Sequence, residues 1–257
     1  MASPISVRRF QAGDSTRWNA FVFDCPDATF FHRIEWRDII ERVFRHRCHY
    51  LLAERDGHIV AVLPLVEVNS RLFGHSMTSL PFAVYGGVAG SDADAVAALE
   101  AEAETISRQA GVQHLEYRNL RARHEDWPRQ DLYVTFRKEI LPEEEANMLA
   151  IPRKQRAMVR KGIKNGLKSE VDGSVDRFFA LYADNVHRHG TPALSKRYFQ
   201  ALRDTFGDEC EVLTVTGPDG QLLSSVLSFY FRDEVLPYYA GDDWAARELA
   251  ANDFKYW

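Results

Sequence analysis

Apolar residues recur along the chain at two spacings, which predict helices in some stretches and strands in others. Over 32–44, apolar side chains fall three or four positions apart, as on one face of a helix. Over 49–55 and 58–68 the apolar runs are extended, and the Asp56-Gly57 pair between them is a preferred hairpin turn. We therefore expect a helix followed by a two-stranded hairpin in this part of the chain.

The rest of the chain follows the same two patterns. Further helices are expected over 92–110, 174–190, 195–207 and 243–257, and further strands over 5–10, 112–120, 132–140, 210–217, 222–231 and 234–241. Both halves show a helix, a strand, an Asp-Gly turn, two more strands, a glycine-containing loop and a helix. This order predicts a duplicated α/β unit, and the alternative is chance, because Asp-Gly hairpins are common.

The duplication sets the expected domain boundaries. The first unit is predicted over 1–141, and 142–257 is predicted to hold a basic segment followed by the second unit. The last helical pattern runs to Trp257 without a capping residue or a polar tail. We therefore expect the second unit to lack strands that its counterpart has and to be incomplete.

Composition and charge narrow the classes of function. The chain is 46% hydrophobic and carries a formal net charge of −5, which is typical of a folded protein and gives no support to a general nucleic-acid-binding role. The amino terminus lacks the pattern of a secretory signal, and the densest apolar run is short and contains Pro64, so we expect a cytoplasmic protein. The cysteines Cys25, Cys48 and Cys210 are odd in number and far apart, and we expect them to be reduced.

Positive charge is concentrated in the segment 153–168, RKQRAMVRKGIKNGLK, which holds no acidic residue. If the segment is helical, its basic side chains fall within an arc of about 160°. These are Arg153, Lys154, Arg156, Arg160, Lys161, Lys164 and Lys168. Such a face suits a diphosphate group or an RNA backbone, because charge-assisted hydrogen bonds are the strong ones. Gly162 and Gly166 weaken the helix and would permit close approach of a ligand. The alternative is a solvated charged face.

The segment 235–243, VLPYYAGDD, is the second candidate. Alternation on a strand sends Tyr238 and Tyr239 to opposite faces, so one phenol is expected to reach a cleft, where it can donate a hydrogen bond to a substrate or a developing oxyanion. Packing within the sheet is the alternative for either ring. Asp242 is predicted either to position an attacking amine or to cap the last helix.

Other chemistry is not indicated. HRCH at 46–49 lacks the second half of a metal-ligand set, and His187 and His189 point to different faces of a helix, so we predict no metal site. The sequence contains no nucleophile elbow, P-loop or dinucleotide glycine pattern. The loop YGGVAG at 85–90 matches none of these fingerprints and is interpreted as a turn.

Several of these stretches, in order along nearly the whole chain, resemble the FemAB-related proteins. They are FFHRIEWRDIIERVF, YLLAERDGHIVAVLPLV, IPRKQRAMVRKGIKNGLKSEV and LLSSVLSFYFRDEVLPYYAGDD. The resemblance implies an α/β (α+β) fold of two tandem GNAT-like acyltransferase units, with mixed sheets flanked by helices. The likeness is greatest to the subgroup associated with exosortase/PEP-CTERM systems and exopolysaccharide genes, and the family is related to enzymes of peptidoglycan synthesis. Family members continue beyond the helix that ends here.

The resemblance also implies roles for the candidate residues. It implies transfer of an acyl or aminoacyl group to an amine, from acyl-CoA or aminoacyl-tRNA as donor and with no bound cofactor. In the family, a basic helix at this place binds the phosphates of a nucleotide-sugar or lipid-linked acceptor. This carries over first to Arg160 and Lys161, and then to Arg156, Lys164 and Lys154.

The chain departs from the GNAT pattern at one motif, and two other functions compete with acyl transfer. The acyl-CoA fingerprint of GNAT enzymes has only a degenerate counterpart in Arg247, Ala250 and Asn252, which puts acetyl-CoA use in doubt. The main rival is a catalytically silent scaffold of the same fold that docks on an anionic membrane, at the inner face of the plasma membrane, or on polysaccharide machinery. Plain RNA binding is the weaker rival, because no aromatic-interleaved RNA motif is present.

Overall fold

The computed structural model describes residues 3–70, 72, 74–130 and 133–257. Its contacts divide the chain into two compact units, Met1–Glu125 and Asp126–Trp257. The first unit has two sheets and the second has one, each with covering helices, so the predicted α/β class with mixed sheets flanked by helices is confirmed.

The first unit contains two sheets. Its helical elements are η1 (Ala12–Asp14), α1 (Ser15–Asp24), η2 (Phe30–His32), α2 (Glu35–Ile39), η3 (Ile40–Phe44) and α3 (Ala93–Ala110). Its strands are β1 (Ser6–Arg9), β2 (Arg47–Cys48), β3 (Leu51–Arg55), β4 (His58–Leu63), β5 (Leu65–Ser70), β6 (Gly74–Ser79) and β7 (His114–Glu116). The strand orders are β1-β3-β4 and β2-β5-β6-β7, and β6 pairs with β7 in parallel.

The predicted hairpin of the first unit is present over 51–63, but the strand predicted over 58–68 is divided into β4 and β5, which belong to different sheets. Arg55 pairs with His58 across a two-residue turn, and Asp56 and Gly57 have φ angles of 51° and 76°. Two successive positive φ angles match the right-handed twist of the strands, which is why this pair is favoured there. Helix α3 packs on β3 and β4, and Leu99 is fully buried in the core between them.

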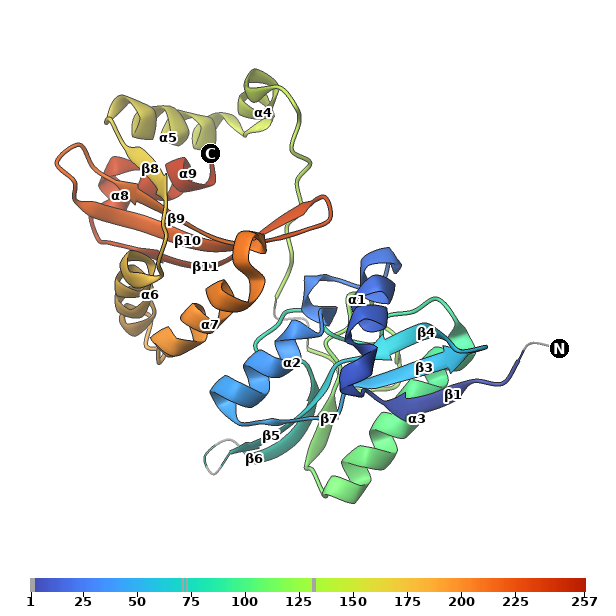
Figure 1. Ribbon diagram of the computed structural model, residues 1–257. Coiled ribbons are helices and arrows are strands. Elements are labelled where there is room, and N and C mark those ends of the chain that lie inside the picture. Colours follow the sequence, from blue (N-terminus) through green and yellow to red (C-terminus); the bar gives the residue numbers. More distant parts are fainter. Residues whose placement is uncertain (1–2, 71, 73, 131–132) are drawn as a thin grey trace. The chain divides into compact units, whose positions relative to one another are not determined.

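The second unit is built on one antiparallel sheet. Its helices are α4 (Glu144–Ala150), α5 (Arg153–Lys164), α6 (Asp176–Arg188), α7 (Lys196–Phe206), η4 (Gly207–Glu209), α8 (Ala246–Leu249) and α9 (Ala251–Tyr256). Its strands are β8 (Lys168–Val171), β9 (Cys210–Thr216), β10 (Leu222–Phe231) and β11 (Glu234–Asp242), in the order β11-β10-β9-β8. Figure 1 shows α6 and α7 on one face of this sheet and α5, α8 and α9 on the other.

Two further predicted elements are wrong. Residues 133–140 form no strand and are exposed, and Leu132 lies outside the described residues. The last helix is also not continuous, because Ala250 has a φ of 61° and separates α8 from α9. A residue in this left-handed conformation ends a helix, and an alanine there gives no warning in the sequence.

Candidate functional site

Helix α5 carries the basic segment and presents it on one side. Arginine, lysine, glutamine, alanine and methionine favour a helix over its first turns, and Gly166, with a φ of 71°, ends it. Val159 and Gly162 are buried, whereas the basic residues of the helix lie at its outer side. The helix therefore separates an apolar contact side from a charged side.

The buried side of α5 packs against α9. A Cβ atom added to Gly162 would lie 2.8 Å from Cβ of Phe254 and 3.3 Å from the carbonyl oxygen of Ala250. Asn165 then donates a hydrogen bond of 3.1 Å to the carbonyl oxygen of Leu249. The neighbour that requires a glycine at 162 is thus Phe254, whereas the sequence suggested a ligand. These contacts fix α5 to the junction between α8 and α9.

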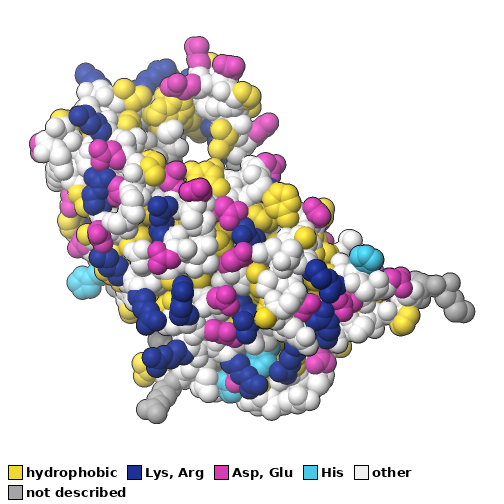
Figure 2. All heavy atoms as spheres, viewed as in Figure 1, with side chains coloured by type: hydrophobic (Ala, Val, Ile, Leu, Met, Phe, Trp, Pro, Cys, Tyr) yellow, Lys and Arg dark blue, Asp and Glu magenta, His cyan; other side chains and the backbone are white. Residues whose placement is uncertain are grey.

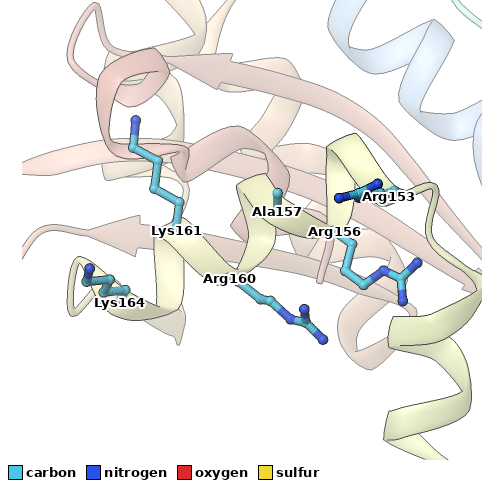
Figure 3. Close-up of a pocket in the computed structure, with 6 residues that line it drawn as sticks. All are labelled: Arg153, Arg156, Ala157, Arg160, Lys161 and Lys164. Atoms are coloured by element: carbon cyan, nitrogen blue, oxygen red, sulfur yellow. The ribbon is translucent and has the colours of Figure 1, made fainter.

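Four cations form a row on the outer side of α5, which we call the cationic stripe: Arg153, Arg156, Arg160 and Lys164. Their spacing of three or four residues places them within an arc of about 80°. Together with Ala157 and Lys161 they line an open hollow of about 600 Å³. In Figure 3, Arg156 and Arg160 extend to the same side, whereas Lys161 extends to the opposite side of the helix. Because every lining residue comes from one helix, the hollow is an open surface suited to part of a larger ligand.

The remaining predicted cations lie beside the stripe. Lys154 is exposed on α5 and does not line the hollow, and Lys168 is the first residue of β8, beyond the end of the helix. The helix therefore ends at Lys164, short of the whole basic segment, which agrees with the weakening expected from the glycines near its end. The structure keeps Arg156, Arg160 and Lys164 together and places Lys161 at their margin.

The stripe is not neutralised by the protein. Within the described ranges, none of its four cations lies within 4.0 Å of a carboxylate oxygen. Figure 2 shows that over most of the visible face Lys and Arg side chains lie interspersed with Asp and Glu. Like charges three or four positions apart destabilise a helix by about 0.2–0.5 kcal/mol per pair. A bound anion relieves this repulsion. The uncompensated charge therefore favours a ligand-binding role for the stripe over that of a solvated charged face.

The two tyrosines of β11 lie at an irregularity of the sheet. Leu227 pairs with Tyr239 and Ser228 pairs with Pro237, so Tyr238 is an extra residue in a β-bulge. The rings of Tyr238 and Tyr239 are in T-shaped contact, with centroids 4.8 Å apart. The prediction that they point to opposite faces was therefore wrong, because a bulge breaks the alternation on which it rested.

The tyrosine rings pack on the side of the sheet that α6 and α7 cover. The Tyr239 hydroxyl lies 3.1 Å from the hydroxyl of Tyr198, and its ring contacts Phe199 and Tyr182. Burial raises the pKa of Tyr239 well above its usual value. The structure therefore places these tyrosines and the helix that bears the cationic stripe on different faces of one sheet.

Asp242, at the end of β11, is held by two buried side chains. Its carboxylate accepts hydrogen bonds from the Ser224 hydroxyl and, at 3.1 Å, from the ammonium group of Lys255, which has no exposed side-chain surface. Burial lowers the pKa of Lys255, and the adjacent carboxylate opposes this shift. The Asp242 side chain thus links the end of β11 to α9, and it makes no cap on the following helix.

The loop between β11 and α8 carries an exposed indole. Trp244 is 74% exposed, and the guanidinium carbon of Arg188 lies 4.6 Å from the centroid of its ring. Arg188 also donates a hydrogen bond to the carbonyl oxygen of Asp242 and forms an ion pair of 2.9 Å with Asp184. Sequence reasoning missed this arrangement, because Arg188 and Asp242 are 54 positions apart and share no motif.

The first unit has a much smaller hollow of about 30 Å³, next to the glycine loop interpreted above as a turn. Gly86 and Gly87 both donate backbone hydrogen bonds to the carbonyl oxygen of Arg118, at 3.0 and 3.1 Å. The Asn119 side chain lies against Gly87, leaving no room for a Cβ atom there. The space is that of about one water molecule, which fits the interpretation of this loop as a turn.

No metal centre or membrane span is evident in the part of the chain that the structure describes. There, no group of three or more His, Cys, Asp or Glu side chains is placed to hold a metal ion. His49, from the HRCH stretch, instead pairs with Glu67 at 3.0 Å. Among the same residues, no helix combines the length and the apolar character needed to cross a membrane.

Known proteins are similar to this chain in two ways. Residues 153–257 match the family model described as acetyltransferase (GNAT) domain. The structure is similar to the crystal structure of FemX, with 12% identity, a TM-score of 0.66, and coverage of 97% of this chain and 83% of that chain. At this identity the likeness shows the fold alone. A search of curated proteins gave no match.

Two further solved structures are similar at a lower level. One is the C-terminal domain of a putative lysylphosphatidylglycerol synthetase from Agrobacterium fabrum, 14% identical, with coverage of 95% of this chain and 73% of that chain and a TM-score of 0.49. The other is a probable N-acyltransferase from Enterococcus faecalis, 8% identical, with coverage of 98% and 61% and a TM-score of 0.42. The segment that bears the cationic stripe is thus similar in sequence to a GNAT acetyltransferase domain, and the chain shares the fold of FemX.

Proposed function

We propose that this protein is an N-acyltransferase that moves an acyl or aminoacyl group to an amine of a cell-envelope or exopolysaccharide-related acceptor. The match of 153–257 to an acetyltransferase (GNAT) domain supports acyl transfer. The observation that carries the proposal is the cationic stripe on α5, which lies within that domain. A link to exosortase/PEP-CTERM systems rests only on the resemblance seen in the sequence.

The stripe is proposed to bind the phosphates of the acceptor, a nucleotide-sugar or a lipid-linked sugar. Arg156 and Arg160 extend side by side, and two guanidinium groups suit the several oxygens of a diphosphate. Lys164 and Arg153 extend the row in both directions, and Lys161 and Lys154 add charge beside it. Binding through phosphates leaves the sugar or peptide end of the acceptor free to reach the reacting centre.

The transfer itself requires one bond to form and one to break. The acceptor nitrogen bonds to the carbonyl carbon of the donor, the C–S bond of an acyl-CoA breaks, and the proton lost by nitrogen leaves with the thiolate. With an aminoacyl-tRNA as donor, the C–O bond of the ester breaks in the same way. The tetrahedral intermediate is stabilised by donors directed at its oxyanion, and no covalent nucleophile is needed.

The bulge in β11 is the proposed place for this step. A bulge interrupts the regular pairing of a sheet, and bulges are enriched next to active sites. Tyr238 is the extra residue of this bulge, and β11 is one of the two edge strands among the described strands of its sheet, so a substrate can pass there from one face of the sheet to the other. We assign the hydrogen bond to the oxyanion to Tyr238, and to Asp242 a role in holding the end of the strand.

Turnover by the full chain tests the proposal. Purified protein is incubated with acetyl-CoA or longer acyl-CoA and an amino-sugar nucleotide, and the product is measured by mass spectrometry; a second set of reactions contains aminoacyl-tRNA. The Arg156→Glu/Arg160→Glu variant should raise the KM for the phosphate-bearing acceptor and leave the KM for a phosphate-free amine unchanged. The matched control, Lys196→Glu/Arg197→Glu, changes two exposed cations of α7 and should behave as wild type. Absence of turnover with every donor contradicts the proposal.

A scaffold that docks on an anionic membrane is the second candidate. It is favoured by the openness of the stripe, which one helix forms alone, and by Ile163 on the same helix, which is 50% exposed. Such a protein would bind the inner face of the plasma membrane through lysine and arginine. Binding to phosphatidylglycerol vesicles without any turnover would favour this candidate over the enzyme.

A further inference from the structure

The indole of Trp244 is a preformed flat surface at the start of the loop that follows β11. The side chain is 74% exposed, and Arg188 is stacked on its ring at 4.6 Å. An exposed tryptophan with one face covered by a guanidinium group has its other face available to a planar ligand.

The arginine that backs the indole is itself fixed. Its guanidinium group donates to the carbonyl oxygen of Asp242, pairs with Asp184 at 2.9 Å, and lies 3.5 Å from the side-chain oxygen of Asn185. The loop is held from the other side, because Asp243 donates its backbone N–H to the carbonyl oxygen of Leu223 at 2.7 Å. The flat surface is therefore preorganised, which lowers the entropy lost when a ligand stacks on it.

We propose that Trp244, backed by Arg188, is a stacking site for a nucleobase, and specifically for the adenine of the acyl donor. Bases stack on tryptophan because every base has a π-face, and a cation on the far side of the indole holds the ring in place. This inference rests on the proposed function, since both proposed donors carry an adenosine group. Acyl-CoA carries an adenosine 3′,5′-bisphosphate group, and aminoacyl-tRNA carries a 3′-terminal adenosine.

The surroundings of Trp244 favour a nucleotide over a membrane or an apolar partner. The indole is flanked in the chain by Asp243 and is followed on α8 by Arg247 and Glu248, which are both exposed. A membrane anchor or a protein interface would require further apolar side chains next to the ring. Arg247, three positions further along the chain, is an exposed cation that suits a phosphate of a stacked nucleotide.

Binding of adenosine 3′,5′-bisphosphate to the full chain tests the site, with tryptophan fluorescence and calorimetry as readouts. Trp244→Ala should weaken this binding roughly tenfold, as loss of one base stack does, and Trp244→Phe should retain most of it. Inorganic pyrophosphate should bind Trp244→Ala and wild type with equal affinity. The control Tyr133→Ala removes another ring of the same unit, 92% exposed, and should change nothing. A short RNA ending in C-C-A, tested beside CoA, tells which source supplies the adenosine.

Two outcomes would exclude the proposed stacking site at Trp244. Equal affinity of Trp244→Ala and wild type for the bisphosphate would do so, and so would a loss of vesicle binding with nucleotide affinity unchanged, which would identify a membrane contact. The proposed function fails separately. If the bisphosphate binds through Trp244 but no acyl group is transferred, the stacking site stands and the enzyme proposal does not. If transfer occurs and Trp244→Ala has the wild-type donor KM, the stacking site alone is excluded.

Discussion

The Nζ atom of Lys255 lies 3.1 Å from a carboxylate oxygen of Asp242, and no part of the lysine side chain is exposed. Lys255 belongs to α9 and Asp242 to the end of β11, so this ion pair joins the last helix to the strand that precedes the loop of Trp244. Ser224 donates to the same carboxylate oxygen. The pair therefore fixes the end of the strand in whose bulge we place the reaction.

Lys255→Met should lower the free energy of unfolding by about 3 kcal/mol, because it leaves the Asp242 carboxylate without its buried counter-charge. Urea denaturation of the two proteins measures the change. The control Lys196→Met breaks an exposed ion pair with Asp176, and its effect should be about 0.5 kcal/mol or less. A stability of Lys255→Met equal to that of wild type would show that the pair contributes nothing to the fold.

The two tyrosines of β11 should respond differently to loss of their hydroxyl groups. Tyr238→Phe should lower kcat by about 100-fold if Tyr238 donates to the oxyanion, with little loss of stability. Tyr239→Phe should lower stability by about 1 kcal/mol, because it leaves the buried Tyr198 hydroxyl without its partner at 3.1 Å, and it should leave kcat nearly unchanged. Steady-state kinetics and urea denaturation of both variants separate these effects. The reverse pattern would assign the catalytic hydroxyl to Tyr239.

Gly162→Ala should destabilise the second unit even though alanine is the better helix former. The intrinsic gain is about 1 kcal/mol, but overpacking costs about 1–3 kcal/mol, and here the new Cβ would lie 2.8 Å from Cβ of Phe254. The net loss should be about 1 kcal/mol in urea denaturation. Gly173→Ala is the control, because a Cβ there has no neighbour within 4 Å. If Gly162→Ala proves more stable than wild type, α5 does not pack this closely on α9.

Asp14 of the first unit should make stability depend on acid pH. A hydrogen bond from Arg8 is the main cause that lowers the pKa of Asp14 from 3.8 to about 2. Because the folded-state pKa is the lower one, this carboxylate adds stability above pH 3.8, and the contribution is lost as the pH falls through about 2. Asp14→Asn should be less stable than wild type at pH 5, and the difference should shrink between pH 4 and 2.

Urea denaturation at a series of pH values measures this dependence. The control is Asp94→Asn, whose side chain is 84% exposed. Its stability curve should run parallel to that of wild type. A constant difference in stability between Asp14→Asn and wild type over the whole acid range would exclude the hydrogen bond from Arg8 to Asp14 as the source of that difference.

The sequence predicted the elements that local interactions determine. The Asp56-Gly57 turn is fixed by the φ angles of two adjacent residues, and Ser195 accepts a hydrogen bond from the backbone N–H of Tyr198, as expected of a helix cap. The strand predicted over 132–140 is not observed, because strand formation depends on non-local pairing. A pattern of β-forming residues becomes a strand only beside a partner strand, and the described part, 133–140, has none.

The candidate site was predictable in part for the same reason. Helical spacing gathers Arg153, Arg156, Arg160 and Lys164 into one row, and this needs no knowledge of the fold. The contacts that fix the row in place were not predictable. Gly162 meets Phe254 from a helix almost a hundred residues later, and the bulge at Tyr238 depends on how β10 and β11 pair. Tertiary packing decides both.

Binding of pyrophosphate to the cationic stripe tests the central claim most directly. Calorimetry is performed at low and at physiological ionic strength on wild type, Arg156→Glu/Arg160→Glu and the control Lys196→Glu/Arg197→Glu. We predict that wild type and the control bind with equal affinity that falls as salt rises, and that the stripe variant binds at least about tenfold more weakly with a shallower salt dependence. Equal affinity and equal salt dependence in all three proteins would contradict the claim that α5 binds the phosphates of a reactant.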